Sequence, residues 1–141
     1  MYTCTKKYEG IPFAHRQHAH DGHCAQVHGH NWTILFTFGA KDRDENGFVV
    51  DFGKLKSLKK YVNSFDHALV LNRDDPEVWR FSELEGHGLV KLKLVDDGSC
   101  EGLARHFAEL ANRLLLPNTR DARCLEVTVH EDHKNSATYH V

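Results

Sequence analysis

Apolar and polar residues alternate in two stretches of the chain, and a period of two is typical of β-strands with one buried face. In residues 89–96, Leu92 and Leu94 point to one side and Lys91 and Lys93 point to the other. In residues 123–131 the alternation is longer, with apolar Leu125, Val127 and Val129 separated by Glu126, Thr128 and His130. We therefore expect two strands whose leucine and valine side chains face the core.

A hairpin is predicted earlier in the chain. Residues 31–40 are rich in β-branched and aromatic side chains, and residues 45–52 continue in the same way after a charged turn. The dipeptide Asn46-Gly47 is a frequent turn sequence, so residues 31–52 are expected to form an antiparallel hairpin with a slightly long loop.

Two segments between these strands have helical features. Residues 53–65 place apolar side chains three or four positions apart, with lysines on the opposite side; the apolar set is Leu55, Leu58, Val62 and Phe65. Asp75 followed by Pro76 is typical of a helix start, and predicts a short helix around Val78 and Phe81.

The strongest helix prediction follows Ser99, which is a suitable capping residue. Glu101 lies in the first turn, where a negative charge is favourable, and Pro117 is expected to end the helix. One face of this helix is apolar, comprising Leu103, Phe107, Leu110, Ala111 and Leu114. Strands, then helices, then strands indicate an α+β fold with a mainly antiparallel sheet, formed by one domain over residues 1–141.

Charge and hydropathy exclude two classes of partner. The formal net charge is −2, whereas a nucleic-acid binder needs a basic face to neutralise phosphates. No apolar segment approaches the roughly 20 residues that cross a bilayer, and the first ten residues lack the apolar core of a signal peptide. We expect a cytoplasmic protein whose four cysteines, which lack disulfide spacing, are thiols.

Histidines are concentrated between His15 and His30, around Cys24. His28 and His30 are two positions apart and lead into a predicted strand, so both imidazoles lie on the same face and can bind one ion. Zn²⁺ prefers imidazole and thiolate ligands. The segment therefore predicts a zinc site, although a solvated histidine-rich loop is the simpler alternative.

The spacing of these residues leaves the third ligand open. Cys24 would complete a Cys-His₂ site, whereas one of the upstream histidines would complete a three-histidine site with a thiol nearby. The upstream candidates are His15, His18, His20 and His23. A catalytic zinc keeps one open position, which the three-histidine alternative provides.

Five motifs in this order resemble the 6-pyruvoyl-tetrahydropterin synthase family, whose bacterial branch includes 6-carboxy-tetrahydropterin synthase of the queuosine pathway. The first is Phe13-Ala14-His15-Arg16 followed by Cys24-x-x-x-His28-Gly29-His30. The others are residues 49–56 (VVDFGKLK), 65–72 (FDHALVLN), 99–104 (SCEGLA) and Glu131 at the end of the last predicted strand. Together they span nearly the whole chain.

The resemblance implies a tunnelling fold, in which a four-stranded antiparallel sheet carries two helices on one face and subunits join edge to edge into a barrel. It also implies a homo-oligomer, usually a hexamer, with each active site shared between subunits. The implied substrate is 7,8-dihydroneopterin triphosphate and the implied cofactor is zinc.

Position by position, the resemblance implies that His15, His28 and His30 bind zinc while Cys24 remains uncoordinated and transfers a proton. Asp66 and His67 would supply a second acid/base pair, because a carboxylate fixes the tautomer of the histidine beside it. Glu131 would accept two hydrogen bonds from the pterin. Glu101 would contact the substrate too, although its position in the first turn of the helix explains it without a function.

The expected reaction is formation of 6-carboxy-tetrahydropterin, a lyase reaction with loss of triphosphate and a two-carbon aldehyde; the motifs do not distinguish it from its alternative, and the short, bacterial-type chain favours it. The alternative is the 6-pyruvoyl product, formed by triphosphate elimination. Non-catalytic alternatives are a zinc-binding domain and a pterin-binding protein without turnover. Three extra histidines (His18, His20 and His23) and residues 74–98 match none of the five motifs.

Overall fold

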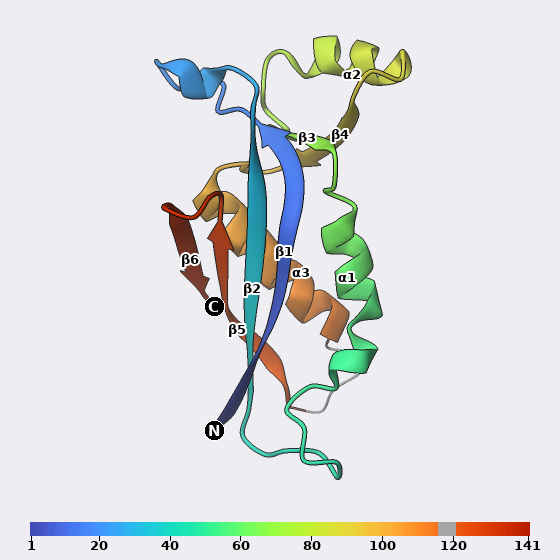
Figure 1. Cartoon of the computed structure of the whole chain (residues 1–141), viewed down its shortest axis with the longest axis vertical. Helices are drawn as coiled ribbons and strands as arrows, with labels where there is room; N and C mark the ends of the chain where they lie inside the picture. The colour runs from blue at the N-terminus through green and yellow to red at the C-terminus, as the bar shows by residue number, and fades with distance from the viewer. Residues whose placement is uncertain (116–120) are drawn as a thin grey trace.

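The computed structural model describes residues 1–115 and 121–141, which form one sheet with helices beside it (Figure 1). The strands are β1 (Tyr2–His15), β2 (His28–Ala40), β3 (Ala68–Asn72), β4 (Lys91–Val95), β5 (Arg123–His130) and β6 (Ser136–His140). The α-helices are α1 (Lys56–Asn63), α2 (Val78–Gly86) and α3 (Cys100–Leu115), and short 3₁₀ turns span His23–Ala25 and Phe52–Lys54.

The sheet has the order β4-β3-β1-β2-β5-β6. Its centre is antiparallel, since β2 pairs with β1 on one side and with β5 on the other. Two short strands, β3 and β4, extend it beside β1 in parallel orientation. The α+β prediction is confirmed, but the sheet has six strands rather than four, because the buried segment of β3 pairs with the end of β1 and β4 follows it.

The predicted hairpin over residues 31–52 is wrong in its second half. β2 forms as expected but pairs with β1 rather than with residues 45–52. The segment after β2 turns instead around Asp44, whose Oδ1 accepts the backbone N–H groups of Asn46 (2.9 Å) and Phe48 (2.8 Å). These bonds to a side chain satisfy backbone groups that a strand would need for its ladder.

Two predicted helices cover one face of the central strands and build the core. In α1 and its flanks, the four apolar residues predicted to share a face are all buried: Leu55, Leu58, Val62 and Phe65. In α3 the Oγ of Ser99 accepts the backbone N–H of Gly102 at 3.0 Å, which confirms the cap. The predicted end of this helix at Pro117 lies outside the described residues.

The third helix, α2, lies beyond the sheet, at the same end as the loop between β1 and β2 (Figure 1). It begins at Val78, two residues after Pro76, and Asp75 precedes it with Oδ1 accepting the backbone N–H of Glu77 at 2.9 Å. The predicted short helix is confirmed, but its capping position is Glu77 rather than Asp75, so Pro76 lies before the helix and not in its first turn. In the described part of the chain, no helix has the length and apolar character needed to span a membrane.

Two strands orient their side chains differently from the prediction. In β4 the ammonium of Lys93 lies over the rings of Tyr61 and Phe65, while Leu94 is 39 % exposed. The long lysine stem packs on aromatic surface, which reverses the expected inner and outer faces. In β5 an irregular register beside Thr37 turns Cys124 inward in place of Leu125.

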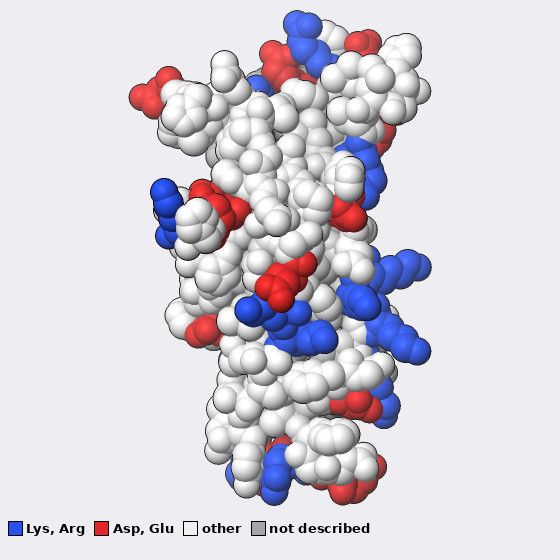
Figure 2. All heavy atoms as spheres, in the orientation of Figure 1, with Lys and Arg blue, Asp and Glu red and all other residues white. Residues whose placement is uncertain are grey.

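Charged residues mark the surface unevenly. Figure 2 shows Lys and Arg side chains gathered along one side of the molecule at the level of α1. All lysines of this helix are exposed, and the face opposite them carries the buried Leu58 and Val62. The run of lysines is therefore the solvated side of an amphipathic helix.

Candidate metal centre

Three histidines meet where the last residue of β1 lies beside the first residues of β2. His15 pairs with His28, and Phe13 pairs with His30. Directly paired residues on neighbouring strands point to the same face of the sheet, and so do residues two apart on one strand. All three imidazoles therefore lie on the same face. One nitrogen from each ring lies within 4.8 Å of the others, an arrangement that could hold a metal ion.

Backbone carbonyls orient two of these rings. His15 Nδ1 lies 2.7 Å from the carbonyl oxygen of Gly98, and His28 Nδ1 lies 2.8 Å from that of Gln26. When Nδ1–H donates to a carbonyl, Nε2 carries the lone pair, and metal-binding histidines are usually held by such a bond from the other ring nitrogen. His15 Nε2 is buried and has no hydrogen-bond partner among the residues that the structure describes. A metal ion is the group that this nitrogen and its neighbours fit.

The electrostatics of His15 favour the neutral ring that a metal requires. Burial lowers its pKa below the ordinary value, and the neighbouring His28 and His30 lower it further, against an opposing effect of the bond to Gly98. A neutral imidazole can bind a cation without first releasing a proton.

The buried ring of Trp32 packs against the histidine cluster. Its ring centroid lies 4.9 Å from that of His15 and 5.3 Å from that of His30. Its indole N–H donates to the carbonyl of Phe13 at 3.0 Å, and its ring stacks on that of Phe13 at 4.4 Å. Access to the centre from this side is closed by aromatic packing, so a ligand must approach from the opposite side.

Cys24 is not a member of the group of donor atoms that could hold a metal within the described residues. It lies in the short 3₁₀ turn of the β1–β2 loop and is partly exposed. The extra histidines of this loop are absent from the group as well; one of them, His20, accepts the backbone N–H of Gly22 at 2.8 Å. Of the alternatives left by the spacing, the geometry favours three histidines and a separate thiol.

Glu131 follows the end of β5 and turns toward the histidines. Its Oε2 lies 3.8 Å from His30 Nε2, and its side chain is 24 % exposed. Glu101, in the first turn of α3, is exposed, but its charge reaches the same region. Both carboxylates raise the pKa of the thiol of Cys100, which burial has already raised, to about 11. Cys100 therefore remains a thiol, and its S–H donates to the carbonyl of Val129 at 3.1 Å.

Asp66 and His67 form a close pair, with 2.5 Å between Oδ1 and Nδ1, but it does not reach the histidine cluster of its own chain. His67 precedes β3, whereas His15 pairs with Val70, so the two histidines are about 10 Å apart along the strands. The side chain of His67 is 85 % exposed. Its φ of +61° lies in the left-handed region, which residues with a side chain adopt only occasionally.

The ion pair between Arg16 and Asp75 in this region was not predicted from the sequence. Arg16 donates from Nε and Nη2 to the carboxylate of Asp75 at 2.6 and 2.7 Å, and from Nη1 to the carbonyl of Ala25 at 3.0 Å. This pair raises the pKa of Arg16 and lowers that of Asp75. Arg16 directly follows a predicted ligand, which is the one signal in the sequence that could have indicated it.

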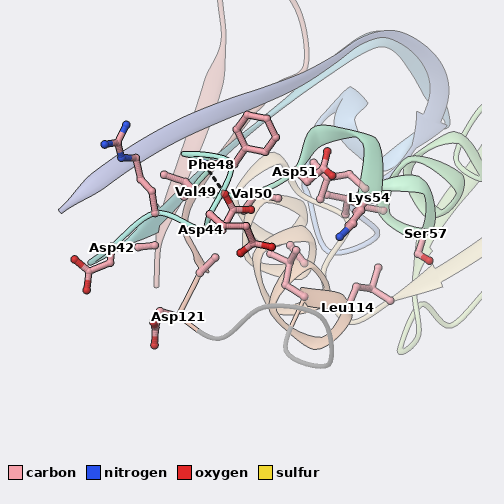
Figure 3. A pocket seen from close by; sticks show the side chains of 18 residues that line it. Asp42, Asp44, Phe48, Val49, Val50, Asp51, Lys54, Ser57, Leu114 and Asp121 are labelled. Atoms are coloured by element: carbon pink, nitrogen blue, oxygen red, sulfur yellow. Dashed lines mark hydrogen bonds between the residues drawn. The ribbon is translucent and has the colours of Figure 1, made fainter.

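A hollow of about 550 Å³ lies away from this centre, beside α1 and the loop after β2 (Figure 3). Its rim carries Asp42, Asp44 and Asp121, and apolar side chains such as Leu58 line it deeper. None of the predicted site residues lines it. The hollow and the histidine cluster are therefore two separate features of the molecule.

The chain is similar to a known protein family and to named relatives. The family model described as 6-pyruvoyl tetrahydropterin synthase matches residues 3–141. A protein of Rickettsia bellii named 6-carboxy-5,6,7,8-tetrahydropterin synthase is 37% identical over 110 residues, covering 76% of this chain and 78% of the relative. A Bacillus subtilis protein of the same name is 26% identical over 118 residues, covering 84% and 70% of the two chains.

Solved structures show the same fold. An uncharacterised protein from Wolinella succinogenes superposes with a TM-score of 0.84 at 18% identity, covering 99% of this chain and 97% of the other. The 6-pyruvoyl tetrahydropterin synthase of Plasmodium vivax superposes with a TM-score of 0.67 at 19% identity, covering 100% and 99%.

Proposed function

The chain belongs to the 6-pyruvoyl tetrahydropterin synthase family, and on that premise we propose that it is a zinc-dependent 6-carboxy-5,6,7,8-tetrahydropterin synthase. The reaction converts 7,8-dihydroneopterin triphosphate and water to 6-carboxy-tetrahydropterin, acetaldehyde and triphosphate, a step toward queuosine and related 7-deazapurines. The observation that carries the proposal is the cluster of three histidine nitrogens within 4.8 Å of one another, together with a buried His15 nitrogen that has no partner in the described part of the chain.

His15, His28 and His30 would hold the zinc ion. Three nitrogens with one open position are the ligand set of a catalytic zinc site rather than a structural one. When bound there, zinc would draw electron density from the hydroxyl groups of the substrate side chain, and would favour the thiolate form of a nearby cysteine.

Cys24 would remove a proton from the substrate side chain. Its loop follows the ligand His15 and precedes the ligand His28, so the thiol is carried by the segment between two ligands. A cysteine that is partly exposed and outside the donor group can accept a proton as the thiolate and return it as the thiol.

Asp66 and His67 would supply the second acid/base group to the site of a neighbouring subunit. The short contact between their side chains orients the imidazole. Their exposure and their distance from the histidines of the same chain support a role across a subunit interface. β4 and β6 are the outer strands of the sheet, and pairing of such edges in a cytoplasmic hexamer would close the barrel.

Glu131 would fix the pterin. A carboxylate can accept two parallel hydrogen bonds from the 2-amino group and a ring N–H. Its place beside His30 supports this role, because a pterin bound there would lie next to the metal, with the substrate side chain over the open position. Glu101 would contribute negative charge near the same ring.

The experiment that tests the function is identification of the product. Zinc-loaded protein is incubated with 7,8-dihydroneopterin triphosphate, and the pterin is analysed by mass spectrometry while acetaldehyde is assayed separately. A carboxylate on the pterin together with acetaldehyde supports the proposal. A 6-pyruvoyl product without acetaldehyde would assign the chain to the alternative reaction. The name of the Plasmodium vivax structural neighbour refers to that reaction. Zinc binding without any product would leave a non-catalytic zinc-binding domain.

A further inference from the structure

A continuous series of hydrogen bonds connects the ring of His15 with the loop that carries Cys24. The first half starts at the histidine, whose Nδ1 lies 2.7 Å from the carbonyl oxygen of Gly98. The backbone N–H of Gly98 donates in turn to Oδ1 of Asn72, also at 2.7 Å, and this bond is buried. The carbonyl that orients the ligand is therefore held in place by the side chain of Asn72.

The second half starts from the other end of the same amide. Asn72 Nδ2 donates to Oε1 of Gln17 at 3.2 Å. The backbone N–H of Gln17 donates to the carbonyl oxygen of Cys24 at 2.9 Å. The side chain of Asn72 thus contacts both Gly98, whose carbonyl orients a predicted metal ligand, and Gln17, whose backbone binds the predicted proton-transfer residue.

The surroundings of Asn72 explain why this amide is held in one position. It ends β3, in which every residue is buried, and is itself 8 % exposed. A buried amide is costly unless its donor and acceptor both find partners. The fit around it is close, since a Cβ added at Gly98 would lie 3.2 Å from the Asn72 oxygen.

We propose that Asn72 is a positioning residue that couples the orientation of the metal ligand His15 to the placement of the Cys24 loop. The inference rests on the proposed function in one respect, namely that these two residues serve the same reaction. The acceptor side of the amide sets the position of Gly98 and thereby the ring of His15. The donor side sets Gln17 and thereby the turn that contains Cys24.

The loop has a second and independent attachment, so loss of the amide loosens it without releasing it. Arg16 is bound to the buried carboxylate of Asp75 and donates to the carbonyl of Ala25, next to Cys24. A protein that lacks the Asn72 side chain should therefore fold and keep the loop near the site, but with the thiol less well fixed.

The experiment compares three variants. Asn72→Ala removes the hydrogen bonds of the amide to both Gly98 and Gln17, whereas Gln17→Met removes only the side-chain bond on the Cys24 side. Asn112→Ala is the matched control, because Asn112 also uses both ends of its amide, here to bind the backbone of Cys124 at 3.0 and 2.8 Å, away from the histidines. Circular dichroism and size-exclusion chromatography establish that each variant folds and assembles.

Two measurements report on the two halves, and neither depends on turnover. The first is zinc affinity, by competition with a chromophoric chelator. The second is the rate at which iodoacetamide modifies Cys24 in metal-free protein, followed by peptide mass spectrometry, with Cys4 as internal reference. If the wild-type protein shows no turnover, the proposed function fails while both measurements still test the coupling.

For Asn72→Ala we expect zinc affinity about 10-fold or more below wild type, as for other outer-sphere partners of metal ligands, and faster modification of Cys24. For Gln17→Met we expect the change in Cys24 alone, with zinc affinity within about twofold of wild type. Unchanged values in Asn72→Ala, or equal changes in Asn112→Ala, would overturn the proposal. If Asn72→Ala does not fold, Asn72→Ser replaces it, since the shorter side chain cannot span both contacts.

Discussion

Oε2 of Glu131 lies 3.8 Å from Nε2 of His30, so a carboxylate from the end of β5 and an imidazole from the start of β2 share one side of the metal centre. Both side chains are largely shielded from water, at 24 % and 21 % exposure. The predicted substrate anchor and a predicted metal ligand are therefore neighbours. This closeness raises the question of whether Glu131 serves the substrate or the metal.

Glu131→Gln separates these two roles. The amide keeps one acceptor but cannot accept two hydrogen bonds from the pterin, so kcat/KM should fall about 10- to 100-fold. Zinc content, measured by elemental analysis, should stay at the wild-type level. Loss of zinc in this variant would show that the carboxylate binds the ion instead.

Cys24→Ala should abolish most of the turnover and leave zinc in place. Removal of a proton-transferring side chain costs about 100-fold or more in kcat. Cys4→Ser is the matched control, because Cys4 pairs with Phe38 at the end of β1 remote from His15, and this variant should retain activity. Zinc lost from Cys24→Ala would identify the thiol as a ligand.

Single replacements of the histidines should differ in their effect on the metal-free protein. His28→Ala should lose zinc binding while the unfolding free energy of metal-free protein hardly changes, because His28 is only partly buried. His15→Ala should lose zinc binding and also about 1–2 kcal/mol of stability, since its ring is buried and hydrogen-bonded. Chemical denaturation with and without zinc measures both quantities. Zinc should stabilise the wild type and neither variant.

Mixed oligomers test whether Asp66 and His67 act in a neighbouring subunit. Cys24→Ala and His67→Ala should each be inactive alone, whereas unfolding and refolding them together should restore activity. If each site takes one group from each of two chains, random mixing leaves about a quarter of the sites intact. Absence of recovered activity in well-assembled mixtures would place both groups of a site on the same chain.

The pair of Tyr61 and His106 should make stability depend on pH. The Tyr61 hydroxyl lies 2.7 Å from His106 Nε2, and burial, followed by Arg113 and Arg73, lowers the pKa of His106 below the ordinary 6.5. The unfolded chain therefore binds a proton before the folded chain does, so this contribution to stability is present above pH 6.5 and is lost on acidification below it.

His106→Gln removes this titration and keeps a polar partner for Tyr61. The difference in unfolding free energy between wild type and variant should shrink as the pH falls from 7.5 to 5.5, by no more than about 1.4 kcal/mol per pH unit for one proton. Urea denaturation at several pH values measures it. A difference that is constant with pH would contradict the prediction.

Local patterns in the sequence determined several elements correctly. The spacing of Leu58 and Val62 predicted α1, and Ser99 predicted the start of α3. Both features depend on residues within a few positions of one another, so neighbouring side chains are sufficient to specify them. The alternation at His28 and His30 likewise placed two imidazoles on one face, because the geometry of an extended strand fixes that relation.

Other features depend on contacts between distant parts of the chain. The pattern did not predict β1, which is interrupted by a register shift between Tyr8 and Ile11, nor that β2 pairs with it rather than with residues 45–52. Spacing alone also left the third ligand open between Cys24 and the upstream histidines. Pairing of His15 with His28 across the two strands decides which ring joins the cluster.

The sequence by itself therefore determined which residues could bind a metal or transfer a proton, and to which family the chain belongs. The tertiary structure alone decided that Glu131 lies beside His30 and that Asn72 joins the supports of His15 and Cys24. The physical reason is that these relations depend on strand register and on the course of buried hydrogen bonds. Such relations are fixed only when segments far apart in the chain pack against one another.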